Sequence, residues 1–160
     1  MAKEYYPFVE YAGYGWAGMG PLDFAHTITK SGIAIRKLQD TLKFDAVAFC
    51  GSSGSAIAFH LGIKYKIPLL YVRKKNEDCH GSSVECNGIN LQIKKYLIVD
   101  DFIDTGKTIH HIINSIASRA RKQSAYPAKP VGIFCFDPVQ CTKPFAVTDK
   151  KSIQIYSIRH

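Results

Sequence analysis

The sequence has no long run of apolar residues. None of its stretches approaches the roughly 20 residues that a membrane-spanning helix needs, and the N-terminal stretch MAKEYYPF lacks the apolar core of a signal peptide. We therefore expect a cytosolic protein without a membrane segment. Internal repeats and low-complexity tracts are also missing. A length of 160 residues with 46% hydrophobic content suits one compact domain with a buried core.

Closely spaced cysteine pairs are absent as well. The five cysteines include no C-x-x-C arrangement, which argues against a structural zinc site, and their odd number favours reduced thiols. Acidic residues are outnumbered by basic ones, 13 to 21, which gives a net charge of +8. This excess is compatible with nucleic-acid binding, with an anionic small substrate or with a basic surface, because the positive runs are spread along the chain.

Short apolar runs alternate with segments of helical spacing along the chain. The apolar runs predict strands at residues 46–50, 69–72, 96–99, 131–136 and 153–158. Helical spacing covers residues 22–42, with a break near Ser31 and Gly32, and then residues 55–65 and 109–120. The alternation predicts an α/β fold with a parallel sheet covered on both faces. Ligands of such sheets bind beyond the carboxyl ends of the strands.

The stretch IVDDFIDTGKT, residues 98–108, carries the strongest chemical signal. Its apolar strand ends in Asp100 and Asp101, and Thr105-Gly106-Lys107-Thr108 then opens a helix. Free N–H groups of a first helical turn, two hydroxyls and the helix dipole form a seat for a phosphate. The carboxylates would repel that phosphate, so they bind hydroxyls or a metal-bound water, and together the features describe a phosphorylated sugar. A Walker-type loop is excluded, because Asp101 stands where that motif needs a glycine.

The same stretch resembles the signature of the type I phosphoribosyltransferases, in which apolar residues precede [ED]-D-x-x-x-[ST]-G-x-[ST]. Every specified position of the pattern is met. The likeness extends upstream through FCGSSGSAIAFHLGIKYKIPLLYVRKK and covers about residues 44–120. The resemblance implies a single domain over residues 1–160, with its core at about 44–136. Terminal segments would add a small hood, to which Tyr14 or Trp16 could contribute.

The resemblance also implies a reaction and a set of site residues. The reaction is Mg²⁺-dependent transfer of ribose 5-phosphate from phosphoribosyl pyrophosphate (PRPP) to a nucleobase, with release of pyrophosphate. The catalytic residues would be Asp100, Asp101 and Asp104. The first two would bind the ribose hydroxyls, and they are also candidate Mg²⁺ ligands. The 5′-phosphate would be bound by Asp104, Thr105, Gly106, Lys107 and Thr108. The pyrophosphate would be bound by Gly51, Ser52, Ser53, Gly54, Arg73, Lys74, Lys75 and His80.

The acceptor base stays open at this point. Asp104 favours a 6-oxopurine, because hypoxanthine-guanine and xanthine enzymes of the family have an aspartate there. His80 followed by glycine resembles the orotate branch instead, although Asn76-Glu77-Asp78 stands where that branch has a further lysine. Phe136 and Asp137 stand where the purine enzymes of the family have a lysine that contacts the purine. Phe136 could stack on a base or belong to the core.

The polar stretch 76–95 is expected to be a long loop that closes over the reacting centre.

A second function also stays open, in which a regulator of the same fold binds PRPP and RNA or DNA without transferring anything. Its best local support is the basic run at residues 119–122 beside Tyr126. For the transferase, the resemblance implies a cytoplasmic homodimer whose partners are PRPP and a base, with no membrane.

Overall fold

The computed structural model describes residues 21–75, 77, 82–87, 92–123, 125–136, 144–148 and 151–158, with the side chains of Pro21 and Ser53 excepted. Its helices are α1 (Pro21–Leu42), α2 (Gly51–Tyr65) and α3 (Lys107–Lys122). Its strands are β1 (Ala46–Cys50), β2 (Leu69–Val72), β3 (Val84–Cys86), β4 (Lys95–Asp100), β5 (Lys129–Cys135), β6 (Phe145–Thr148), β7 (Lys151–Ile153) and β8 (Ile155–Tyr156). Tyr14 and Trp16, the expected hood residues, lie outside the described residues.

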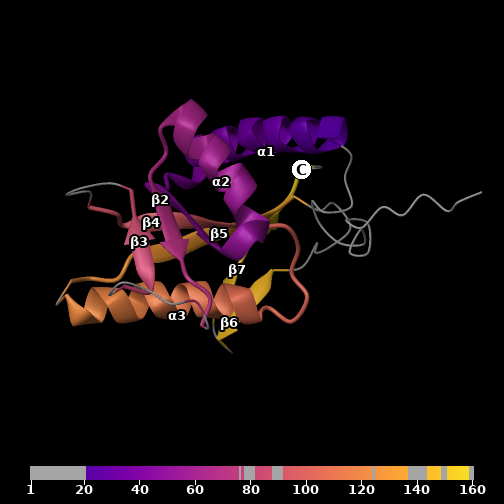
Figure 1. The fold of residues 1–160 in the computed structure, drawn as a ribbon. Coiled ribbons are helices and arrows are strands. Elements are labelled where there is room, and N and C mark those ends of the chain that lie inside the picture. Colours follow the sequence, from indigo (N-terminus) through magenta and orange to yellow (C-terminus); the bar gives the residue numbers. More distant parts are fainter. Residues whose placement is uncertain are drawn as a thin grey trace, which may run out of the picture.

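Six of these strands form one sheet in the order β3-β2-β1-β4-β5-β8. The pairs from β2 to β8 are parallel, and β3 adds an antiparallel edge to β2. Helices α1 and α2 cover one face of the sheet and α3 covers the other (Figure 1). β6 and β7 form a separate antiparallel hairpin. The predicted α/β architecture is confirmed.

Each face of the sheet carries its own hydrophobic core. Successive residues of β1 point to opposite faces, as the pleat of a strand requires. Ala48 therefore packs in the core that contains Ile112 of α3, while its neighbour Val47 packs in the core that contains Leu61 of α2. Each fully buried branched side chain contributes about 1.5–3 kcal/mol. Burial on both faces explains why β1 and the inner part of β4 read as continuous apolar runs.

The expected break of the first helix near Ser31 and Gly32 is wrong, because α1 continues through both residues. Gly32 is a contact point between helices. A Cβ on this residue would lie 3.0 Å from the His60 ring and 3.2 Å from the Tyr65 ring of α2. Glycine permits the close approach of α1 to α2 here, and the packing gained offsets its low helix propensity.

Three other boundaries differ from the sequence expectations. α2 begins at Gly51, so residues 51–54 form its first turn instead of a preceding loop. The stretch 76–95, expected to be one long loop, includes strand β3. The expected last strand at 153–158 is divided between the end of β7 and β8. Among the described helices, none has the length and apolar character needed to cross a bilayer.

Candidate active site

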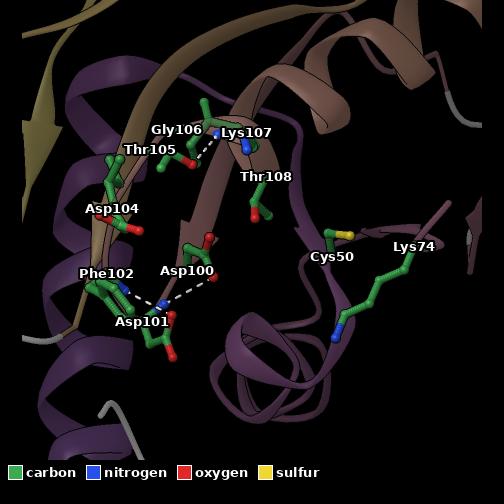
Figure 2. Close-up of a pocket in the computed structure, with 12 residues that line it drawn as sticks. Cys50, Lys74, Asp100, Asp101, Phe102, Asp104, Thr105, Gly106, Lys107 and Thr108 are labelled. Carbon is green, nitrogen blue, oxygen red and sulfur yellow. Dashed lines mark hydrogen bonds between the residues drawn. The ribbon is translucent and has the colours of Figure 1, made fainter. Parts of the chain in front are cut away.

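A cavity of about 340 Å³ opens beyond the carboxyl ends of β1 and β4. Figure 2 shows three aspartates on one side of this hollow, Lys74 on the opposite side and the start of α3 above it. Most residues that the sequence motif singles out therefore meet at one place. The lining residues are Cys50, Lys74, Asp100, Asp101, Phe102, Ile103, Asp104, Thr105, Gly106, Lys107, Thr108 and Ile109.

The acidic pair is held by hydrogen bonds from the turn that follows β4. The Asp101 N–H donates to Oδ1 of Asp100 at 3.1 Å, and the Phe102 N–H donates to Oδ1 of Asp101 at 2.9 Å (Figure 2). The two aspartates are only 5% and 9% exposed, whereas Asp104 is exposed. Two buried carboxylates with fixed inner oxygens leave their outer oxygens to accept hydrogen bonds from hydroxyl groups.

Burial changes the acid–base properties of two groups in the cavity. Loss of water raises the pKa of Asp100 to about 7, and the adjacent charge of Asp101 adds to this shift. The pKa of the Cys50 thiol rises to about 11, first through burial and then through the charge of Asp100. Cys50 therefore stays a neutral thiol near pH 7 and is a poor nucleophile. Asp100 by contrast sits near its titration point, so a positive charge placed beside it would favour its ionised form.

The raised pKa of Asp100 predicts a pH-dependent effect of Asp100→Asn. Between the ordinary aspartate value of 3.8 and about 7, the folded protein keeps a proton that the unfolded chain has lost, so this group lowers stability as the pH rises. Asparagine removes that penalty. The stability of Asp100→Asn relative to the wild type should therefore increase by roughly 2–3 kcal/mol from pH 5 to pH 8. Urea unfolding of both proteins at the two pH values measures this change.

Asp104→Asn is the matched control, because its carboxyl is exposed on the same turn. It controls for the loss of one carboxylate from this turn. A stability difference between Asp100→Asn and the wild type that does not change with pH would contradict the burial of an ionisable pair in this cavity.

The start of α3 forms the upper wall of the cavity. Gly106 occupies the N-cap position in the left-handed region at φ 72°, and the helix begins at Lys107. Glycine has no side-chain acceptor. Among the described residues, the N–H groups of the first turn therefore remain available to an anion, apart from a long 3.5 Å contact from the Lys107 N–H to Oγ1 of Thr105. These donors and the helix dipole suit a phosphate.

Phe145 of β6 packs against this turn, and the sequence offered no signal for it. A Cβ on Gly106 would lie 2.4 Å from the Phe145 ring, whose centroid is 5.1 Å from that of His110 in α3. Glycine is therefore required at position 106 both by its backbone angle and by the covering ring. The hairpin of β6 and β7 thus helps to fix the shape of the turn at residues 105–108.

Gly51 and Gly54 at the start of α2 serve different purposes. Gly51 has φ 65°, and the aliphatic part of Lys74 crosses it, since an added Cβ would lie 2.4 Å from Lys74 Cε. The glycine thus lets Lys74 reach over α2 toward the cavity (Figure 2). Gly54 instead packs on β4, because its Cβ would lie 2.3 Å from the carbonyl oxygen of Val99. Ser52 is exposed and its carbonyl accepts the Ser55 hydroxyl at 2.7 Å.

The three basic residues that follow β2, Arg73, Lys74 and Lys75, lie in different surroundings. Among the described residues, Lys74 is the member of this triplet that lines the cavity. The Arg73 guanidinium forms an ion pair with Glu85 of β3 at 2.6 Å and lies over the Tyr71 ring. Lys75 lines a neighbouring hollow beside α3.

Glu77 stands in the segment that departs from the orotate pattern, and it has a structural role here. Its carboxylate accepts hydrogen bonds from the Tyr71 hydroxyl at 3.0 Å and from the Lys74 N–H at 3.2 Å. An acidic residue thereby shapes the turn that carries Lys74.

The remaining candidate residues lie away from the cavity or outside the described part. Phe136 is 1% exposed and packs in the core on the α1 and α2 side. His80 and Asp137 lie outside the described residues. Sequence reasoning missed Cys50 and Phe102 as lining residues, although each is adjacent to a motif residue. Arg119, Arg121 and Lys122, the basic run considered for nucleic acid, end α3, and Arg119 and Tyr126 line a separate hollow.

Comparison with known proteins places these features in context. The chain is 30% identical over 117 residues to the orotate phosphoribosyltransferase of Pyrobaculum aerophilum, covering 73% of this chain and 56% of that protein. It is 30% identical over 95 residues to the hypoxanthine/guanine phosphoribosyltransferase of Methanothermus fervidus, covering 52% of this chain and 50% of the relative. The chain thus spans about half the length of these curated relatives. No family model matches it.

The fold has solved counterparts as well. The crystal structure of orotate phosphoribosyltransferase from Aeropyrum pernix superposes with a TM-score of 0.58 at 17% identity, covering 87% of this chain and 72% of that one. This likeness confirms the fold. Both sequence relatives are named phosphoribosyltransferases, as the acidic motif suggests. The resemblance read from residues 98–108 is therefore confirmed, because the sequence relatives are named phosphoribosyltransferases and the fold is that of a phosphoribosyltransferase.

Proposed function

We propose that the protein is a nucleobase phosphoribosyltransferase that transfers the ribose 5-phosphate of PRPP to a base nitrogen and releases pyrophosphate. One observation carries this proposal: a buried pair of carboxylates and an anion-binding helix start share a cavity of about 340 Å³. A sugar phosphate matches both halves, because its hydroxyls suit the carboxylates and its phosphate suits the free N–H groups. The names of the two sequence relatives agree with this reaction.

Each group of the cavity has a role in the proposed reaction. The turn at residues 105–108 binds the 5′-phosphate, and its binding energy positions the sugar. The bond from C1 of the ribose to pyrophosphate breaks with its electron pair leaving on oxygen, the lone pair of the base nitrogen forms the new bond, and a proton carried by that nitrogen passes to solvent. The carboxylates of Asp100 and Asp101 accept hydrogen bonds from the ribose hydroxyls. They also stabilise the positive charge that develops on the ribose ring. Lys74 lies across the cavity and offsets the charge of the leaving pyrophosphate.

Mg²⁺ fits the donors of this site. Carboxylate oxygens are ligands that Mg²⁺ accepts, usually together with phosphate oxygens of the substrate. Within the part of the chain that the structure describes, no group of three or more His, Cys, Asp or Glu residues could hold an ion alone. Asp100 and Asp101 would be the protein ligands of the ion, and the ion would neutralise charge on the pyrophosphate.

We also propose a cytoplasmic homodimer in which residues 1–160 form one domain.

The acceptor base is the finer part of the proposal. Asp104 lines the cavity with an exposed carboxyl, which suits a base that exchanges a proton or donates a hydrogen bond. This feature favours a 6-oxopurine, whereas one of the two relatives is named for orotate and the other for hypoxanthine and guanine. Neither relative is named as a regulator, and within the described part of the chain no contact of the 119–122 run favours the nucleic-acid alternative.

Pyrophosphate release tests the function and identifies the base. The protein is incubated with PRPP, Mg²⁺ and, separately, hypoxanthine, guanine, xanthine, adenine, orotate or uracil. We expect release that depends on one base or one closely related pair, because a site that hydrogen-bonds its substrate rejects an analogue lacking the matching group by about 10⁴-fold. Release with hypoxanthine or guanine supports the role of Asp104, and release with orotate supports that of the stretch around His80. Absence of release with every base would count against the transferase.

A further inference from the structure

A histidine on α3 connects the two ends of the proposed PRPP site. His111 lies in the second turn of α3, half-buried, and its Nε2 is 2.8 Å from the carbonyl oxygen of Arg73. A carbonyl can only accept, so Nε2 carries the proton and donates this hydrogen bond. Its helix begins with the phosphate turn, and its acceptor is the residue immediately before Lys74. The contact therefore joins the phosphate side of the cavity to the segment that carries its lysine.

The segment that carries Lys74 lies beyond the end of β2 and depends on a few contacts. The Arg73 N–H donates to the Ser83 carbonyl at 3.0 Å, on the side of the β3 edge. Glu77 closes the turn from within by accepting the Lys74 N–H. His111 supplies the contact from the α3 side. The Lys74 side chain is itself exposed. The position of this backbone therefore sets the direction in which the side chain extends over Gly51.

We propose that His111 is a positioning residue that holds the backbone at Arg73, so that Lys74 faces the pyrophosphate half of the site while α3 holds the 5′-phosphate half. This inference rests on the proposed function. It predicts that His111 acts on one half only. Loss of its hydrogen bond loosens the turn that carries Lys74 on the α3 side, whereas the first turn of α3, with Gly106 held under Phe145, keeps its own contacts.

Calorimetry with the two halves of the substrate tests this inference. Inorganic pyrophosphate with Mg²⁺ and ribose 5-phosphate are titrated separately into the full chain and its variants. His111→Leu removes the donor and should weaken pyrophosphate binding about tenfold, the effect of one lost hydrogen bond that orders a binding segment. Its affinity for ribose 5-phosphate should stay within about twofold of the wild type. His111→Gln places an amide N–H near the position of Nε2 and should restore most of the pyrophosphate affinity.

Asn114→Leu is the control, because Asn114 is exposed one turn further along α3 and lines a surface hollow together with His111. It should bind both ligands as the wild type does. Equal binding of pyrophosphate by His111→Leu and the wild type would overturn the inference and leave the proposed function standing. Parallel loss of both ligands, or a His111→Gln variant as weak as His111→Leu, would reduce His111 to general packing and also overturn it. A wild-type protein that binds neither ligand would overturn the proposed function together with this inference.

Discussion

Replacing Asp101 by asparagine should lower turnover by about 10²–10³-fold and leave the fold intact, on the scale of removing one group that stabilises transition-state charge. Asp101 is 9% exposed, and its Oδ1 is held by the Phe102 N–H. A carboxylate that is itself buried interacts strongly with the positive charge proposed for the ribose ring, because little solvent screens the carboxylate. Asparagine has nearly the same shape but no charge, so binding of PRPP should fall less than turnover.

Steady-state kinetics of the Asp101→Asn variant, with circular dichroism to verify the fold, measures this effect. Asp40→Asn is the control, because that carboxylate is exposed on α1, where it pairs with Arg36. This control should retain wild-type turnover. If Asp101→Asn also keeps near-normal turnover, its assigned role in charge stabilisation is wrong.

Gly54→Ala should destabilise the protein by about 3 kcal/mol or more, at the upper end of the cost of overpacking a core. The added Cβ would lie 2.3 Å from the carbonyl oxygen of Val99 and 2.9 Å from Phe49 Cβ. Backbone in the middle of the sheet cannot move aside as a flexible side chain can. The variant must therefore push α2 away from β4, which also separates Cys50 and Gly51 from Asp100. Urea unfolding gives the stability change, and we expect PRPP binding to fall with it.

Gly62→Ala is the matched control in the same helix. Its Cβ would meet Leu69 Cδ1 at 3.0 Å, and that atom is the end of a flexible side chain. The improved helix propensity of alanine, worth about 1 kcal/mol, then offsets much of the contact. Similar stabilities of the two variants would show that the approach of α2 to β4 is not as close as described.

The sequence predicted well those features that depend on neighbouring residues. The strand limits at 46–50 and 69–72 agree with β1 and β2, because the apolar runs there reflect burial on both faces. The acidic motif placed Asp100 and Asp101 at the end of a strand and the turn at residues 105–108 at a helix start, where the structure has them. In each case a local pattern of side chains determines the local backbone.

The features that the sequence did not predict depend on contacts between distant segments. Phe145 covers Gly106 from a hairpin almost 40 residues further along the chain, and nothing in the motif specifies it. Arg73 looks like a ligand for pyrophosphate in the sequence, but the antiparallel edge brings Glu85 beside it. Gly32 looks like a helix break until α2 is packed against it. Pairing and packing of this kind follow from the assembled sheet, which a local pattern does not contain.

The product of the reaction tests the central claim most directly, because pyrophosphate could also come from hydrolysis of PRPP. The protein is incubated with PRPP, Mg²⁺ and the base that supports release, and the mixture is analysed by mass spectrometry, with Asp101→Asn in parallel. We predict the nucleoside 5′-monophosphate of that base in the wild-type sample and at least about 10²-fold less in the variant. Ribose 5-phosphate and pyrophosphate without any nucleotide, or equal yields from both proteins, would contradict the assignment of a phosphoribosyl transfer to this acidic pair.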